Sequence, residues 1–258
     1  MLQLSFRHYG DHADPPIVLL HGLFGSSSNW GSIAKYLAER YFVLVPDLRN
    51  HGQSPHDPDV SYQAMVDDLL GLFDAQGIDA ATLVGHSMGG KVSMHLALNY
   101  PQRVNALAVV DMSPISYSHD FDNILAGFDA VDVHAVKNRS EADAQMATQI
   151  PERGIRAFLL QNLVKQADGW GWRLNLASLA ARQAEITDFP DQPDGVSYEG
   201  PSSFIYGELS GYVKPAYEQA IRRYFPNAEL CPVAGAGHWV YAEQPEGFRH
   251  CLEAFLAG

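Results

Sequence analysis

A serine between two glycines is the strongest chemical signal in the sequence. Residues 85–89 read G-H-S-M-G, after a short apolar run at 82–84 and before an amphipathic stretch at 92–96. That order predicts a strand, a tight turn and a helix, which would lift the Ser87 hydroxyl above a sheet. Glycine suits both flanks of such a turn because side chains there would block its strained backbone. The pattern predicts a serine nucleophile for acyl transfer.

A second signal lies near the C-terminus, where residues 235–239 read G-A-G-H-W. A general base must be neutral near pH 7 and must reach the serine hydroxyl, and a histidine on a glycine-rich loop can do both. The sequence has 11 histidines, and His238 is singled out by its place in such a loop downstream of the serine. We predict that His238 activates Ser87.

A third glycine-rich stretch, H-G-L-F-G at residues 21–25, follows the apolar run at 17–20. Ligands of an α/β sheet bind at the carboxyl ends of its strands, where this loop would lie. Acyl transfer needs two N–H donors for the oxyanion of its tetrahedral intermediate. We predict that the backbone N–H groups of Leu23 and Met88 supply them, with Phe24 as the alternative if the register differs by one residue.

The apolar pattern along the chain predicts the elements that would position these residues. Short apolar runs alternate with longer stretches of helical period, which is typical of an α/β sheet. The apolar runs lie at 2–6, 17–20, 42–45, 82–84, 107–110, 203–206 and 229–233, and the helical stretches at 30–37, 62–73, 92–100 and 248–255. Residues 113–184 interrupt this order with helical patterns, and 188–201 read as a returning loop. We expect a core of residues 1–112 and 201–258, with a helical cap insertion and its return loop at 113–200.

Composition narrows the class of protein. The chain has 258 residues, 47% of them hydrophobic, and a formal net charge of −13. Such a charge argues against nucleic acids and anionic membranes as partners. Because no apolar run reaches the roughly 18 residues of a membrane span and no secretory leader pattern is found, we expect a cytoplasmic protein. The two cysteines, Cys231 and Cys251, match no metal motif and are expected to be reduced thiols near the core.

Five segments together resemble the α/β-hydrolase superfamily and, within it, the small YbfF-type bacterial esterases. They read IVLLHGLFGS at 17–26, DLRNHGQS at 47–54, GHSMGGK at 85–91, DMSP at 111–114 and GAGHW at 235–239. The resemblance implies an eight-stranded, mostly parallel sheet flanked by helices, a helical cap, no cofactor, and hydrolysis of esters or thioesters. The insertion at 113–200 would then be the cap.

The acid that would pair with His238 has two candidates. In many α/β-hydrolases it is an Asp in the loop after the strand that here lies at 203–206, but residues 207–210 read G-E-L-S and Ser210 stands at that place. Asp111, at the end of the neighbouring predicted strand, is the preferred acid, as the resemblance to YbfF-type esterases also implies. Glu208 is the alternative, and the sequence leaves open whether Glu208 or Ser210 assists.

Large apolar side chains of the predicted cap, together with residues beside the three loops, are candidates for substrate binding. These candidates are His21, Phe24, Phe128, Phe158, Leu159, Trp170, Trp172 and Trp239. A cap rich in such residues should enclose a compact, largely apolar pocket. We therefore expect short or medium acyl esters to be preferred over long triglycerides.

The sequence predicts a serine carboxylesterase that acts on small-molecule esters as a monomer or a small homo-oligomer. Other functions of the same fold stay open, namely lactonase, C–C bond hydrolase, perhydrolase and non-catalytic receptor. Enzymes of this fold that use an Asp nucleophile are disfavoured by the serine at position 87. Lys91 lies four residues after Ser87, so the S-x-x-K pattern of β-lactamases is absent. Since no metal or nucleotide motif is found, we expect no metal and no cofactor.

Overall fold

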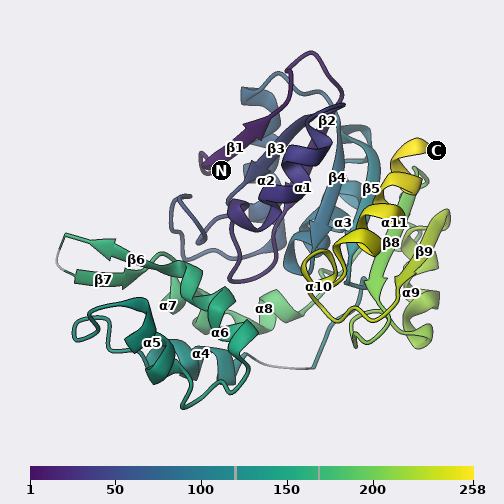
Figure 1. Cartoon of the computed structure of the whole chain (residues 1–258). Helices are drawn as coiled ribbons and strands as arrows, with labels where there is room; N and C mark the ends of the chain where they lie inside the picture. Colours follow the sequence, from purple (N-terminus) through teal and green to yellow (C-terminus); the bar gives the residue numbers. More distant parts are fainter. Residues whose placement is uncertain (119–120, 168) are drawn as a thin grey trace.

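Figure 1 shows the computed structural model of the chain, which describes residues 1–118, 121–167 and 169–258. Within these residues, seven strands form one sheet in the order β1-β3-β2-β4-β5-β8-β9. Strand β1 pairs antiparallel with β3, and the other neighbours pair parallel. The strands are β1 (Phe6–Tyr9), β2 (Pro16–Leu20), β3 (Phe42–Pro46), β4 (Ala81–His86), β5 (Val104–Val110), β8 (Ser202–Gly207) and β9 (Ala228–Val233).

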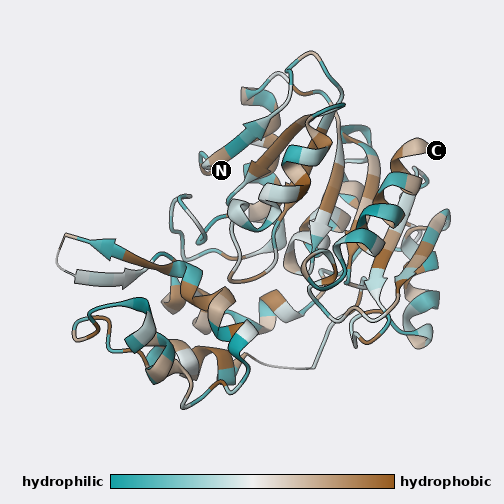
Figure 2. Cartoon of the chain, in the orientation of Figure 1, coloured by the Kyte–Doolittle hydropathy of each residue, from teal (hydrophilic) through white to brown (hydrophobic). Residues whose placement is uncertain are grey.

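Helices cover both faces of this sheet, which explains why its central strands are almost entirely apolar. Alternate residues of one strand serve different faces: Ile17 belongs to a buried cluster with residues of α1 and α11, and Val18 to a separate cluster with residues of α2, α3 and α9. Figure 2 shows mostly hydrophobic strands in the sheet and helices that mix hydrophobic and hydrophilic residues. These helices are α1 (Gly31–Leu37), α2 (Tyr62–Ala75), α3 (Met88–Asn99), α9 (Glu218–Tyr224) and α11 (Pro245–Ala257), and the short α10 (Val240–Glu243) precedes α11.

The first strand begins later than the sequence pattern predicted, and the sheet has seven described strands where the resemblance implied eight. Leu2 and Leu4 lie before β1. The N–H of Leu2 donates to the carboxylate of Asp68, and the N–H of Ser5 donates to Oγ of Ser54 at 2.9 Å. These backbone groups are therefore bonded to side chains and not to a neighbouring strand.

Between β5 and β8, the described chain forms five short helices and a hairpin, which lie together below the sheet in the view of Figure 1. They are α4 (Asp122–Asp129), α5 (Arg139–Met146), α6 (Arg153–Leu159), α7 (Leu176–Ala181), α8 (Gln183–Thr187), β6 (Leu163–Gln166) and β7 (Gly169–Trp172). The hairpin corrects the helical prediction for this stretch. Two glycines, Gly169 and Gly171, weaken any helix here, and Gly169 has a φ of 133° that other residues rarely adopt.

Cys231 and Cys251 form a disulfide, so the prediction of two reduced thiols was wrong. Cys231 lies in β9 and Cys251 in α11, and their Cα atoms are 6.1 Å apart. The bond closes the segment that carries the 235–239 loop. The sequence shows no sign of it, because the two cysteines meet only when α11 packs back against the sheet. No helix in the described part of the chain is both long and apolar enough to cross a membrane.

Candidate active site

Ser87 lies on a sharp turn between β4 and α3, where its backbone has a φ of 54° and a ψ of −118°. The flanking glycines are required by close contacts. A Cβ on Gly85 would lie 2.2 Å from the carbonyl oxygen of Gly89, and a Cβ on Gly89 would lie 2.6 Å from the carbonyl oxygens of Leu20 and His21. The turn therefore packs backbone against backbone, and it presents the serine hydroxyl at the carboxyl end of β4.

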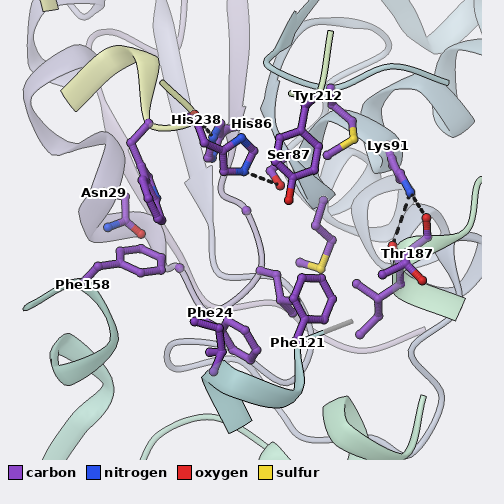
Figure 3. A pocket seen from close by; sticks show the side chains of 18 of the residues that line it. Phe24, Asn29, His86, Ser87, Lys91, Phe121, Phe158, Thr187, Tyr212 and His238 are labelled. Atoms are coloured by element: carbon purple, nitrogen blue, oxygen red, sulfur yellow. Dashed lines mark hydrogen bonds between the residues drawn. The ribbon is translucent and has the colours of Figure 1, made fainter. Parts of the chain in front are cut away.

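His238 lies between Ser87 and Asp111, as Figure 3 shows for the serine side. Its Nδ1 is 2.6 Å from Oδ2 of Asp111, and its Nε2 is 3.1 Å from Oγ of Ser87. Because a carboxylate only accepts, Nδ1 carries the proton and Nε2 accepts from the serine hydroxyl. The Asp111 side chain is fully buried, and that of His238 is 20% exposed. This arrangement can move a proton from the serine to the imidazole.

Asp111 is held at the end of β5 by its own backbone and by further hydrogen bonds. Its φ is 50°, outside the strand region. Besides the imidazole, the hydroxyl of Ser210 donates to Oδ2 at 2.5 Å and the N–H of Gly207 donates to Oδ1 at 3.2 Å. Ser210, which stands where an Asp was expected, thus binds the carboxylate that contacts the histidine. Glu208 is exposed, and its carboxylate accepts from the N–H of Gly235 at 3.4 Å.

The loop at residues 21–25 fixes the peptide group that carries the N–H of Leu23. The carbonyl oxygen of Gly22 accepts from Nδ1 of His21 at 2.8 Å and from the N–H of Gly25 at 3.0 Å. Since N–H and C=O point in opposite directions across a trans peptide, the N–H of Leu23 is directed away from those donors. Leu23 and Met88 both line the pocket around Ser87, as two oxyanion donors would require.

Two buried histidines, His21 and His51, hold this loop in place by hydrogen bonds to the backbone. Nε2 of His51 accepts from the N–H of Phe24 at 3.1 Å, so the alternative oxyanion donor is already engaged. Nε2 of His21 accepts from the N–H of Leu48 at 3.0 Å. Burial lowers the pKa of His21 and lowers that of His51 to about 3, so both rings are neutral. His21 was predicted to bind substrate, but it is fully buried and bonds the backbone through both ring nitrogens.

Ser87 opens into a mostly apolar pocket with a cavity volume of about 200 Å³ (Figure 3). Its walls come from the three loops, from α2 and α3, and from the 113–200 segment. Of the predicted binding residues, Phe24, Phe158, Leu159 and Trp239 line the pocket, whereas His21, Phe128, Trp170 and Trp172 do not.

Two predicted binding residues that do not line the pocket, Phe128 and Trp172, pack behind its wall. Phe128 packs against Phe24 and Trp172, with ring centroids 5.4 and 4.8 Å apart. Trp170 lies on the hairpin under the cations of Arg139 and Lys165. A large apolar side chain in this segment is equally suited to either task, so residue type alone could not separate them.

A family model described as alpha/beta hydrolase fold matches residues 15–245. The chain belongs to this family. It is 45% identical over 257 residues to the sn-1-specific diacylglycerol lipase ABHD11 of Mus musculus, a match that covers 96% of this chain and 83% of that protein. It is 39% identical over 246 residues to the esterase YbfF of Escherichia coli, a match that covers 95% of this chain and 94% of that protein.

The solved structure of a marine microorganism esterase resembles this alpha/beta hydrolase with a TM-score of 0.94 and 35% identity, covering 98% of this chain and 99% of that one. These matches confirm the predicted fold class and the resemblance to YbfF-type esterases. The chain is thus an alpha/beta hydrolase of the esterase and lipase type.

Two further side chains of the hydrolase position His238, and sequence reasoning assigned neither. Nε2–H of His86 donates to the carbonyl oxygen of His238 at 2.8 Å, and burial holds the pKa of His86 well below its usual value. The ring of Tyr212 stacks on the imidazole, with centroids 4.2 Å apart and planes 28° apart. The only feature of the sequence that could have pointed to His86 is its place within the G-H-S-M-G motif. Tyr212 follows Ser210 by two residues in a loop that offers no pattern.

Proposed function

We propose that the hydrolase is a serine carboxylesterase with Ser87 as nucleophile, His238 as general base and Asp111 as the acid of the triad. The observation that carries the proposal is the unbroken chain of hydrogen bonds from Oγ of Ser87 through His238 to the buried carboxylate. An esterase and a diacylglycerol lipase among the relatives support the same reaction class.

The geometry accounts for each step of ester hydrolysis. Nε2 of His238 takes the serine proton as Oγ attacks the acyl carbon, and then delivers it to the leaving alcohol. Asp111 stabilises the imidazolium through Nδ1–H. The N–H groups of Leu23 and Met88 hold the oxyanion, and Met88 is the first residue of α3, so the positive end of the helix dipole adds to them. Water then hydrolyses the acyl-enzyme, with His238 again as base.

The proposed substrates are short- to medium-chain acyl esters or thioesters. A cavity of about 200 Å³ is below the roughly 300–1,000 Å³ of pockets that hold drug-sized ligands, and its walls are mostly apolar. The 113–200 segment supplies part of these walls through Ile155, Phe158 and Ile186. We therefore propose that this segment acts as the cap that limits substrate size. The diacylglycerol lipase name of one relative makes a longer acyl ester the informative comparison.

The decisive experiment compares Ser87→Ala with the wild-type protein on p-nitrophenyl acetate and p-nitrophenyl butyrate. Loss of the nucleophile should lower kcat by about 10⁶, whereas the fold, followed by circular dichroism, should not change. Ser140→Ala, which removes an exposed hydroxyl on α5, is the matched control and should keep full activity. Turnover within tenfold of wild type in folded Ser87→Ala protein would contradict the proposal.

Two more outcomes of the same assay are informative. A wild-type protein that binds these esters without turning them over would favour a receptor of this fold. Faster hydrolysis of an emulsified long-chain diacylglycerol than of the butyrate ester would contradict the proposed preference for short chains.

A further inference from the structure

The pocket has two unlike ends, which lie on opposite sides of Ser87 in Figure 3. At one end, Asn29 and Phe158 line both the pocket and a wide groove between α1, α6 and α10, so this end is open. At the other end lie Lys91 and Thr187. Lys91, Tyr62 and Ile186 line the pocket there and are buried, whereas Thr187 is partly exposed, and the three buried side chains close this end.

A lysine forms the closed end. Lys91 lies on α3, one helical turn after Ser87, and only 1% of its surface is exposed. Its Nζ donates at 2.6 Å to the carbonyl oxygens of Thr187 and Asp188, and more weakly, at 3.5 Å, to that of Ile186. These carbonyls belong to the end of α8, where the last turn of a helix leaves its acceptors without partners inside the helix, and that of Thr187 also accepts from the N–H of Tyr117 at 3.0 Å. The ammonium therefore fastens α8 to α3.

Two tyrosines complete this closure. The hydroxyl of Tyr62, on α2, donates to the carbonyl oxygen of Ile186 at 2.6 Å. The ammonium of Lys91 lies 5.9 Å from the ring centroid of Tyr62 and 5.0 Å from that of Tyr117. A buried ammonium is costly unless it is paired, and here carbonyl oxygens and ring faces supply the pairing. Burial lowers the pKa of Lys91 to about 7, although the nearby carboxylate of Asp188 opposes that shift.

We propose that Lys91 limits the length of the acyl chain that this hydrolase accepts, by fastening α8 across the closed end of the pocket. The inference rests on the proposed esterase function. It assigns the acyl group to the closed end because the alcohol must leave while the acyl group stays bonded to Ser87, and the open end leads into the groove. A chain long enough to reach Lys91 would have to break its bonds to α8 and leave buried polar groups unpaired, which is unfavourable.

The test measures kcat/KM for p-nitrophenyl esters from acetate to dodecanoate. Lys91→Met keeps an unbranched side chain, one atom shorter, and removes its donors, so α8 keeps only the weaker set of bonds from Tyr62 and the backbone of Tyr117. We expect the preferred chain to lengthen by two or more methylenes and the ratio of decanoate to butyrate kcat/KM to rise at least tenfold, mainly through KM, since one methylene in such a pocket is worth roughly 10- to 200-fold. Lys35→Met, an exposed lysine on α1, is the matched control and should keep the wild-type profile.

A Lys91→Met profile that is parallel to wild type, lower by one factor at every length, would overturn the inference. If circular dichroism shows that Lys91→Met does not fold, Tyr62→Phe makes the same test because it removes only the hydroxyl that binds Ile186. An unchanged decanoate-to-butyrate ratio in folded Tyr62→Phe protein would also overturn the inference. Absence of hydrolysis across the whole series in wild type overturns the esterase function itself, whereas parallel profiles overturn only the limit on chain length.

Discussion

The loops after β4, β5 and β9 and the segment at 113–200 enclose one pocket in different ways. In the loops, backbones with positive φ and buried hydrogen bonds hold Ser87, Asp111 and His238. In the segment, most side chains that reach the pocket are apolar, and some, such as Phe158 and Ile155, are only partly buried. Directional bonds lose their function with a small displacement, whereas an apolar wall can repack. The loops should therefore determine whether the reaction occurs, and the segment which ester is used.

Of the changes that distinguish the loops from the segment, substitution of Asp111 is expected to have the largest effect on kcat. Asp111→Asn keeps the shape of the side chain but favours the wrong imidazole tautomer, so kcat should fall by up to about 10⁴ on p-nitrophenyl butyrate at pH 7 to 8. Glu208→Gln is the matched control and should change kcat by less than about tenfold, because no proton transfer depends on that exposed carboxylate. The reverse ranking would move the acid to the later loop.

A smaller effect, on substrate binding, is expected in the segment. Phe158 lines the pocket and packs on Trp239 at 5.6 Å between ring centroids. Phe158→Ala should raise KM for p-nitrophenyl butyrate by about tenfold with kcat nearly unchanged, because it removes apolar contact that does not change along the reaction.

Trp172→Ala is the control for that prediction, because Trp172 supports the wall through Phe128 without lining the pocket. It should lower the free energy of unfolding by about 3 kcal/mol, as the loss of a large packed ring does, and leave KM within threefold. If Trp172→Ala raised KM more than Phe158→Ala did, the division between lining and supporting residues would be wrong.

The loop that binds the acid offers a finer test. Ser210→Ala removes one of the three hydrogen bonds on the carboxylate of Asp111 and leaves those from His238 and Gly207. We expect a decrease in kcat of about tenfold, since one hydrogen bond to a charged group contributes roughly 1.5–3 kcal/mol and only part of it acts on the imidazolium. Ser210→Thr, which retains the hydroxyl, should recover most of the loss. Equal activity of the alanine variant and wild type would show that Ser210 plays no part in positioning the acid.

The smallest effect on activity is expected at the disulfide. Changing both Cys231 and Cys251 to Ser frees a connection across 20 residues that includes His238. The free energy of unfolding, measured by denaturant titration without reductant, should fall by about 3 kcal/mol, whereas kcat should stay within twofold because the bonds of His238 do not involve the cysteines. Reductant should have the same effect on wild-type protein and none on the double variant. A large loss of kcat would mean that the disulfide also holds the loop in place.

Local pattern was enough to predict the nucleophile, the base and most of the sheet. Gly85 and Gly89 indicate a tight turn around Ser87 from the local sequence alone. His238 was predicted as the base because it lies in a similar glycine-rich loop. Strands β2, β3, β4, β5, β8 and β9 of the main sheet were predicted within a few residues, because burial on both faces leaves a continuous apolar run. Asp111 was preferred from its place at a strand end together with the family resemblance, and the structure brings it to the histidine.

The features that the sequence could not determine all depend on which distant groups meet after folding. Ser210 was noticed as the absence of an Asp, and only the packing of β8 beside β5 turned it into a donor to Asp111. The disulfide forms because α11 returns to β9, and the hairpin at 163–172 pairs residues whose apolar pattern also fits a helix. The sequence analysis used Lys91 only to exclude the S-x-x-K pattern, and its bonds to the carbonyl oxygens at the end of α8 are seen only in the structure. Apolar periodicity and glycine spacing can be read from the local sequence. The hydrogen-bond partner of a polar side chain depends on the tertiary structure, because folding brings the two groups together from distant parts of the chain.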